Sequence, residues 1–299
     1  MTFLHRYQHF FPFLAVLGSV TALGIGTSWA KHWLFPLVGA QGTTAVRVGL
    51  SALVLVALWR PWRWRLRACD ARAIAFYGAA LGGMNLLFYL SLRTLPFGLA
   101  VAIEFAGPLA VAVYASRRAI DFVWVLLAVA GLGLLLPLGG DSLSARALDP
   151  VGVAYALGAA LMWATYIVFG KRVGHLHAGQ SVSLGLLVAA VVVVPVGVVH
   201  AGAALLSPAV WGVGLAVAVM SSAIPISLEM MALKRLPKEA FGIMISMEPA
   251  VAALLAMALL QEHLSADQWL AIGLIVSASM GTAVTAGKRA APAQSPTGA

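Results

Sequence analysis

This sequence has very little charge. Charged residues make up only 10% of its 299 residues, whereas hydrophobic residues make up 62%. A soluble domain of this length needs far more charge on its surface. The apolar runs are about twenty residues long, which suits helices that cross a hydrocarbon core of ~30 Å. They lack the short alternating segments of an outer-membrane barrel. The sequence therefore predicts an all-α membrane protein.

Cysteine and catalytic motifs are equally scarce. The one cysteine, Cys69, excludes an internal disulfide. The sequence contains no His-Glu-x-x-His and no glycine-rich loop ending in Lys-Ser or Lys-Thr, the patterns typical of zinc hydrolases and nucleotide-driven proteins. His175-x-His177 alone is a weak metal signal. We therefore expect no enzyme, no cofactor and no metal site, and we expect any transport to be driven by a gradient.

Acidic residues are also few, 10 against 19 Lys and Arg, and the net charge is +9. The basic segment 60–72 lies beside Trp59, Trp62 and Trp64. Tryptophan and arginine at the end of an apolar run are typical of a membrane interface. We therefore expect membrane lipid, and no nucleic acid, as the partner of this surface.

The apolar runs predict ten spans. Their approximate ranges are 12–34, 41–59, 73–92, 97–116, 121–138, 150–170, 180–201, 209–233, 240–260 and 267–286. When successive loops alternate between the two sides, only Lys31, Arg93 and Arg146 fall on the side opposite to most other Lys and Arg. An excess of basic residues marks the cytoplasmic side. The pattern predicts ten helices with both termini cytoplasmic, and the small, polar residues 287–299 predict a disordered tail.

Two glutamates recur in matching surroundings. The pattern Phe-Gly, with Glu seven residues after the Phe, occurs at Phe97, Gly98 and Glu104 and again at Phe241, Gly242 and Glu248. Each half holds an odd number of predicted spans, so the second half would cross the membrane in the opposite sense. Such inverted repeats are typical of transporters. We expect one five-helix repeat over 12–138 and an inverted copy over 150–286.

Both glutamates are expected near the centre of the membrane. Seven helical residues advance ~10 Å, and Glu104 and Glu248 enter from opposite faces. A carboxyl group inside a bilayer is costly and is usually kept for function. Either group could carry a proton or bind a substrate ammonium. Prolines that remove helix hydrogen bonds predict interruptions of four spans: Pro108, Pro195, Pro225 and Pro249.

Arg47 and Asn85 are further candidates for this site. Arg47 could form a structural ion pair with Glu104, or it could hold a substrate carboxylate. Asn85 follows Gly78-x-x-x-Gly82, a spacing that favours close helix contact. The Asn85 amide could bridge helices or contact substrate.

Tyr89, Trp163 and Glu229 complete the candidate set. Tyr89 lies one turn after Asn85 and could line the cavity. Trp163 and Tyr166 lie mid-span, which favours a cavity over lipid. Glu229 lies near a span end and close to Lys234, so it could take part in the site, pair with Lys234 or extend to the interface.

Several segments together resemble a known family. They are 34–40, 81–85, 104–112, 121–125, 227–230 and 246–250, and the likeness runs from about residue 12 to 286. Here the chain resembles the EamA-type amino-acid exporters of the drug/metabolite transporter superfamily, which are built from two repeats. The resemblance implies that small neutral amino acids, similar to threonine or homoserine, leave the cytoplasm across the bacterial inner membrane in exchange for protons.

The expected function is therefore secondary active export, with an amino acid and protons as small partners. Two alternatives stay open. One is a transporter of other cargo, such as a drug, a nucleotide sugar or a lipid-linked sugar. The other is a membrane sensor that does not transport. The sequence indicates no oligomeric state.

Overall fold

The computed structural model describes residues 3–114, 119–135, 149–233, 241 and 244–290. Every regular element in these residues is helical. The first half contains α1 (Phe3–Trp29), η1 (Ala30–Leu34), α2 (Phe35–Trp59), η2 (Pro61–Arg63), α3 (Ala68–Ser91), α4 (Phe97–Glu104), α5 (Ala106–Tyr114) and α6 (Ala119–Leu135). The second contains α7 (Pro150–Arg172), α8 (Ala178–Ala201), η3 (Gly202–Leu206), α9 (Pro208–Ala218), η4 (Val219–Ala223), α10 (Ile224–Leu233), α12 (Glu248–Leu259) and α13 (Ala266–Ala290). α13 continues past the predicted end at residue 286, and 291–299 lie outside the described residues.

Long apolar helices dominate the fold. Within the described residues, five helical stretches are long and apolar enough to cross a membrane: Pro12–Trp59, Ala68–Ser91, Pro150–Arg172, Gly179–Leu206 and Pro208–Ile226. The first has 48 residues, more than twice the ~20 that one crossing needs. It is interrupted at Gly39, whose φ of 66° is open mainly to glycine. The predicted all-helical class is confirmed, whereas ten spans stay a prediction.

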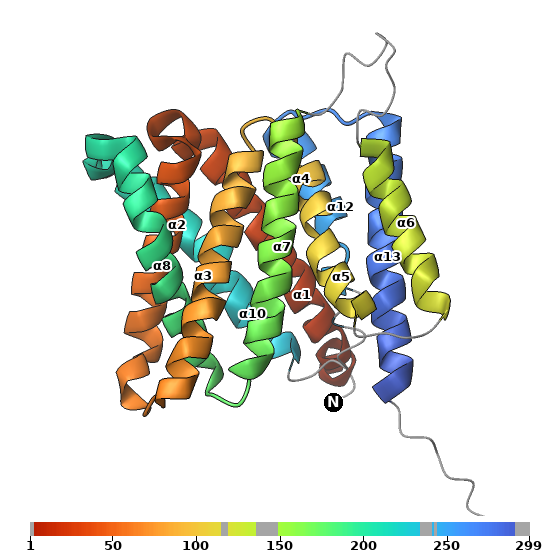
Figure 1. Ribbon diagram of the computed structural model, residues 1–299, viewed down its shortest axis with the longest axis horizontal. Coiled ribbons are helices and arrows are strands. Elements are labelled where there is room, and N and C mark those ends of the chain that lie inside the picture. Colours follow the sequence, from red (N-terminus) through yellow and green to blue (C-terminus); the bar gives the residue numbers. More distant parts are fainter. Residues whose placement is uncertain (1–2, 115–118, 136–148, 234–240, 242–243, 291–299) are drawn as a thin grey trace, which may run out of the picture.

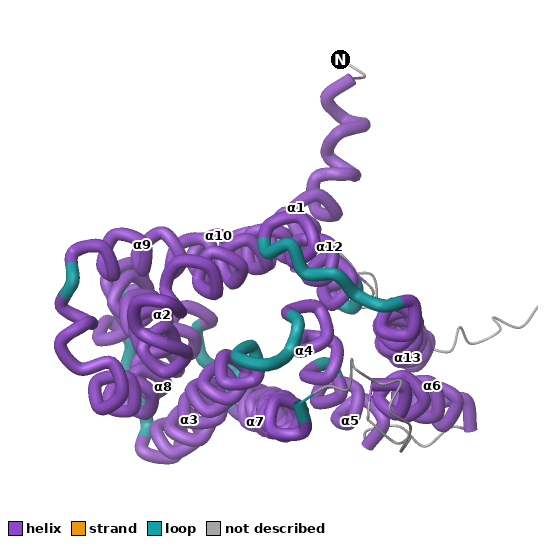
Figure 2. Tube along the Cα trace, turned by 90° about the horizontal axis from the view of Figure 1, so that it is seen from above, coloured by secondary structure: helices purple, strands orange, loops and turns teal. Residues whose placement is uncertain are grey.

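The helices of the two halves interleave. α2 packs against α8, α3 against α7 and α8, and α1 against α10. α4 packs against α12, and α6 packs against α13. The helices run side by side in Figure 1, and α6 and α13 lie together at one edge in both views (Figures 1 and 2). Consequently each buried apolar cluster among the described residues combines side chains of both halves, and a site near the centre draws residues from both.

Glycine allows the closest of these contacts. A Cβ atom added to Gly78 would lie 2.5 Å from the backbone oxygen of Gly185 in α8, and one added to Gly82 would lie 3.0 Å from that of Ala189. The close helix contact predicted from Gly78-x-x-x-Gly82 is therefore confirmed, and it joins α3 to α8 of the same chain. It holds Asn85, one turn further along α3, at a fixed depth in the bundle.

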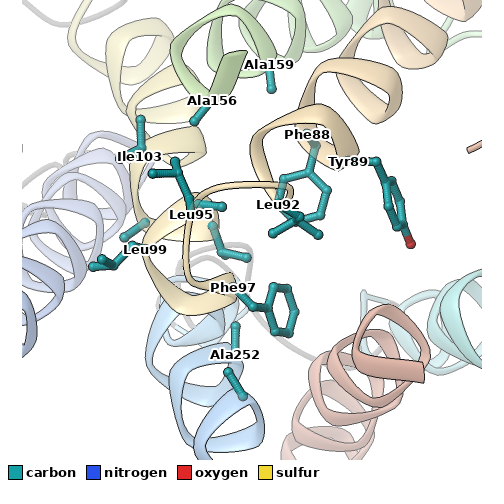
Figure 3. Packing of buried hydrophobic residues seen from close by; sticks show 14 of the residues in the cluster. Phe88, Tyr89, Leu92, Leu95, Phe97, Leu99, Ile103, Ala156, Ala159 and Ala252 are labelled. Atoms are coloured by element: carbon teal, nitrogen blue, oxygen red, sulfur yellow. The ribbon is translucent and has the colours of Figure 1, made fainter. Parts of the chain in front are cut away.

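A dense apolar cluster holds α4 in place. Figure 3 shows Phe88 of α3, Leu92 and Leu95 of the α3–α4 loop, and Leu99 of α4 packed together with Ala156 of α7 and with α12. Every residue of α4 is buried. Burial of apolar side chains contributes about 25 cal/mol per Å², so this cluster fixes the short helix whose last residue is Glu104.

The four prolines have unequal effects. The helix ends at Glu104 and restarts at Ala106, two residues before Pro108. α12 starts at Glu248, with Pro249 in its first turn, after a turn at residues 246–247. Pro225 follows the π-helical turn η4. The prediction for Pro195 is wrong, because α8 continues through it as one helix. A single lost hydrogen bond does not break a helix that packs along most of its length.

Candidate functional site

The two recurring glutamates meet at one cavity. Its volume is about 400 Å³, and its lining includes Glu104 and Glu248. The predicted site residues Arg47, Asn85, Trp163 and Glu229 also line this cavity, together with Tyr166. Tyr89 is the only predicted site residue that does not. Residues from both halves of the chain therefore converge on one space, as the repeat predicts.

Glu104 and Glu248 are placed by two helix ends. Glu104 is the last residue of α4 and is only 7% exposed. Glu248 is the first residue of α12 and is half-buried. A carboxylate is favoured at a helix N-terminus because it faces unpaired N–H groups. The two carboxyl groups interact electrostatically with each other, and both interact with Arg47. The site is thus built where two helices are discontinuous, as in many transporters.

Arg47 is held by hydrogen bonds rather than by a carboxylate. Its Nε donates to Ser221 Oγ at 2.8 Å, and its Nη1 donates to Asn85 Oδ1 at 2.8 Å. Its guanidinium carbon also lies 5.4 Å from the centre of the Tyr89 ring, in cation–π range. Among the described residues, no ion pair joins Arg47 to Glu104, so the structural ion pair considered above is not formed here.

Donors of Arg47 remain for a ligand. A guanidinium has five N–H donors, and the bonds to Ser221 and Asn85 use one each. In the described part of the chain the other three have no hydrogen-bonded partner. Asn85 in turn donates from Nδ2 to Leu81 O at 2.9 Å, which keeps its Oδ1 directed at Arg47. The asparagine therefore bridges helices and also lines the cavity.

Tyr89 lies outside the lining of the cavity, whereas Glu229 is part of it. Tyr89 is fully buried beneath Arg47, and its hydroxyl has no hydrogen-bond partner among the described residues. Glu229 accepts a hydrogen bond from Ser19 Oγ at 2.8 Å. Lys234, its other expected partner, lies outside the described residues. Tyr89 therefore supports the cation from behind, while Glu229 faces the cavity.

A second cavity adjoins the first. Its volume is about 310 Å³, and it shares Arg47, Asn85, Tyr166 and Glu229 with the larger one. Its remaining polar lining consists of hydroxyl groups, from Ser51, Tyr77, Ser221 and Ser222. None of these four residues is among the predicted site residues. Ser51 could have been predicted from the sequence, because it lies one helical turn after Arg47. The positions of Ser221 and Ser222 depend on a local π-helical turn, which the sequence does not reveal.

An ion pair lies beside one end of the larger cavity. Lys31 Nζ lies 2.6 Å from Glu262 Oε1 and donates to Leu95 O at 3.3 Å. Glu262 Oε2 accepts the backbone N–H of Phe97 at 2.8 Å, and the Phe97 side chain lines the cavity. We call Lys31, Leu95, Phe97 and Glu262 the clamp. It joins η1, the start of α4 and the loop between α12 and α13.

The opposite end is hollow. A third space of about 280 Å³ shares Tyr77, Tyr166 and Val182 with the second cavity and reaches the loop between α7 and α8. Tyr77 donates its hydroxyl to Tyr166 Oη at 3.2 Å. We call Tyr77, Tyr166 and residues 173–177 the hollow end. In Figure 1 this loop lies at the bottom, and the loops of the clamp lie at the top.

Across residues 3–114, 119–135, 149–233, 241 and 244–290, no group of three or more His, Cys, Asp or Glu residues could hold a metal ion. Three glutamates, Glu104, Glu229 and Glu248, line the same cavity as Arg47. A site with one cation and several carboxyl groups suits a small zwitterion.

Known proteins resemble this chain along nearly its whole length. Residues 150–284 match the EamA-like transporter family. The threonine/homoserine exporter RhtA of Escherichia coli (strain K12) is 50% identical over 285 residues, which cover 95% of each chain. Its namesake in Salmonella typhimurium (strain LT2) is 51% identical over 274 residues, or 92% of each chain.

A solved crystal structure also shares the fold. It has a TM-score of 0.58 and covers 94% of this chain and 98% of its own, at 17% identity. The sequence relatives are transporters and not enzymes, and the apolar helices fit a multi-pass membrane protein. A sequence identity of 50% over 95% of the length is decisive: this chain belongs to the EamA-like transporter family.

Proposed function

We propose that this protein exports small neutral amino acids of the threonine or homoserine type from the cytoplasm across the bacterial inner membrane, in exchange for protons. One observation carries the proposal. A single cavity of about 400 Å³ brings Arg47, with three available N–H donors, together with Glu104, Glu229 and Glu248. A free amino acid carries one carboxylate and one ammonium, so both of its charges find opposite charges here. The names of the two relatives support the substrate class.

Proton exchange follows from competition for a carboxyl group. An empty site with several carboxyl groups and one guanidinium favours protonation of at least one carboxyl, because like charges repel at close range. An arriving ammonium replaces that proton as the positive partner. Glu104, buried at the end of α4, and Glu248, at the start of α12, are the groups in position to make this exchange. Release of the amino acid then requires a proton from the other side.

The proposed topology is ten helices in two inverted five-helix repeats, over 12–138 and 150–286. The packing pairs support it. Under the predicted correspondence, α2 with α8 and α6 with α13 are pairs of equivalent helices, and α4 and α12 belong to the equivalent spans 97–116 and 240–260. The contacts α1 with α10 and α3 with α7 exchange with one another. A two-fold relation between the repeats requires this pattern.

The basic residues give the direction. Lys171 and Arg172 precede the loop of the hollow end, and the positive-inside tendency therefore favours a cytoplasmic position for the hollow end. The N-terminus and the end of α13 lie toward the same side in Figure 1. The site is then open toward the cytoplasm and closed by the clamp on the outer side, which is the loading state of an exporter.

Transport by purified protein in liposomes tests this function. Wild-type protein should exchange radiolabelled threonine or homoserine in counterflow and drive net efflux down a pH gradient. Exchange that is inhibited by a drug or a nucleotide sugar, and not by amino acids, would contradict the substrate class. Absence of any exchange would indicate a sensor.

Glu104→Gln separates the two proposed roles. Loss of gradient-driven efflux with counterflow intact assigns proton transfer to Glu104, whereas loss of both also assigns ammonium binding to it. Asp267→Asn is the matched control, because Asp267 is exposed at the start of α13. Full gradient-driven efflux by Glu104→Gln would refute the role of this carboxyl group.

A further inference from the structure

Two pairs of side chains join α2 to the π-helical turn η4. Arg47 and Ser51 lie four residues apart on α2, and so on one face of the helix. Ser221 and Ser222 are adjacent in η4. Arg47 Nε donates to Ser221 Oγ at 2.8 Å, and Ser51 Oγ lies 2.8 Å from Ser222 Oγ. The two pairs line the same 310 Å³ cavity one helical turn apart.

The π-helical turn explains how both serines reach the cavity. A π-helical turn bonds residue i to residue i+5 and widens the helix locally, and such turns occur frequently at functional sites. Pro225 lacks the N–H that would bond to Ser221 in an α-helix, which favours the wider turn at this point. Ser221 is already occupied, since it accepts from Arg47 and donates to Val217 O at 2.7 Å. Ser222 is not.

The Ser51–Ser222 pair keeps unused hydrogen-bonding capacity. Each hydroxyl has one donor and two acceptor sites, and the bond between them uses one donor and one acceptor. Within the described residues, neither side chain has another hydrogen bond. Both are buried, at 1% and 9% exposure. Buried polar groups are normally satisfied, so the remaining donor points to a polar ligand in the cavity.

The spacing matches one kind of ligand. Side chains four residues apart on a helix are ~6 Å apart. In a hydroxy amino acid, three or four bonds separate the carboxyl carbon from the side-chain oxygen, a distance on the order of 3–5 Å. A carboxylate bound at the free donors of Arg47 therefore places such a hydroxyl near Ser51 and Ser222.

We propose that Ser51 and Ser222 form the subsite that recognises the side-chain hydroxyl of the exported amino acid. This inference rests on the proposed function and assigns its specificity. The hydroxyl of the ligand accepts the spare O–H of the serine pair and donates to one of its free lone pairs. An analogue without the hydroxyl leaves a buried donor unpaired, and a site of this kind disfavours such analogues.

Counterflow in liposomes with two labelled substrates tests the subsite. Homoserine and 2-aminobutyrate share one carbon skeleton and differ only in the hydroxyl. Wild-type protein should prefer homoserine. Ser222→Ala and Ser51→Ala should each lower the ratio of homoserine to 2-aminobutyrate exchange by roughly tenfold, the usual effect of one hydrogen bond. Exchange of 2-aminobutyrate should stay near the wild-type value.

Two further variants separate recognition from packing. Ser222→Thr keeps the hydroxyl and should keep the ratio. Ser277→Ala is the matched control, because Ser277 is exposed and bonds only to Gly273 O in its own helix. An unchanged ratio in Ser51→Ala and Ser222→Ala, or an equal loss of both substrates, overturns the subsite and leaves the serines a structural role. Wild-type protein that exchanges neither amino acid overturns the proposed function itself.

Discussion

The two ends of the central cavities are built from different chemistry. At the clamp, an ion pair and two hydrogen bonds to the backbone join three elements, and the side chains of Lys31 and Glu262 are only 21% and 17% exposed. At the hollow end, the hydroxyl bond between Tyr77 and Tyr166 crosses a space that continues to the α7–α8 loop. The clamp is satisfied and closed, whereas the hollow end is open around weak, neutral contacts.

This difference indicates where the energy barrier to alternating access lies. A partly buried ion pair is costly to break when one partner is removed, by about 3 kcal/mol or more. A single neutral hydrogen bond contributes about 1 kcal/mol. The clamp should therefore determine which state the protein occupies, and the hollow end should respond with little resistance.

Reversing a charge of the clamp should have the largest effect. Lys31→Glu places two carboxylates together at the clamp. It should shift the equilibrium away from the state in which the clamp is formed, on the order of a hundredfold. Gradient-driven efflux in liposomes should fall to a matching extent. Combining it with Glu262→Lys should restore part of the activity, because the ion pair returns but lysine cannot accept the Phe97 N–H.

Arg93→Glu serves as the control for that experiment. Arg93 is exposed in the loop between α3 and α4 and precedes Leu95 by two residues, yet it forms no ion pair among the described residues. It should transport like wild type. An equal loss in both variants would show that any acidic residue here is harmful and that the clamp has no special role.

Access to the cavity from the two sides should differ by at least about tenfold, because the minor state of such an equilibrium is typically populated at 0.1–10%. Ile226 lines the second cavity, so Ile226→Cys places a reactive thiol there. Cys69→Ser removes the exposed native cysteine. An impermeant maleimide should label the double variant faster from the side of the hollow end. Lys31→Glu should reduce this difference. Equal rates in the clamp-intact protein would contradict a closed outer end.

Removing the tyrosine bond should have a small effect. Tyr77→Phe loses the hydroxyl bond to Tyr166 but keeps the stacked rings, whose centres are 4.7 Å apart. Because the lost bond is neutral, we expect efflux within about threefold of wild type. If Tyr77→Phe proved as damaging as Lys31→Glu, both ends would be gates of similar strength.

The smallest effect is expected at Asp149, beside the loop of the clamp. A hydrogen bond from Thr94, followed by bonds from the N–H groups of Val151 and Gly152, lowers the pKa of Asp149 below its ordinary value of 3.8. A lowered pKa stabilises the folded state above that ordinary value, and the gain is lost as pH falls through the lowered pKa. Asp149→Ala should therefore melt slightly below wild type at pH 7.

A melting series in detergent checks both parts of this expectation. The difference between Asp149→Ala and wild type should shrink as pH falls below about 5 and through the lowered pKa of Asp149. Ser207→Ala is the control, because Ser207 precedes α9 at the same position but makes no capping bond. A difference that stayed constant with pH would show that the cap does not depend on the charge of Asp149.

Much of the site could be predicted because its main motif occurs twice in the sequence. The repeated Phe-Gly and glutamate pattern predicted that Glu104 and Glu248 share one site, and charge within an apolar run selected Arg47. The choice between a Glu104 partner and a ligand for Arg47 could not be made, since it depends on the hydroxyl and amide that approach the guanidinium from η4 and α3.

Other features depend on distant contacts that no local pattern encodes. Lys31 and Glu262 are 231 residues apart, and each looks like an ordinary loop charge in the sequence. Tyr89 has cavity-like spacing from Asn85, but tertiary packing turns it under Arg47. Pro195 carries the same local signal as Pro225, yet only the latter follows a π-helical turn, because packing along α8 outweighs one missing bond.

The shortness of α4 links the two chemical centres of the protein. α4 has eight residues and is therefore about 12 Å long, too short to bend appreciably. Glu262 holds the N–H of its first residue, and its last residue is the buried glutamate of the cavity. Opening the clamp would release one end of a short, stiff helix whose other end carries the carboxyl group proposed to exchange a proton. Under that proposal, movement of α4 and protonation of Glu104 are coupled directly.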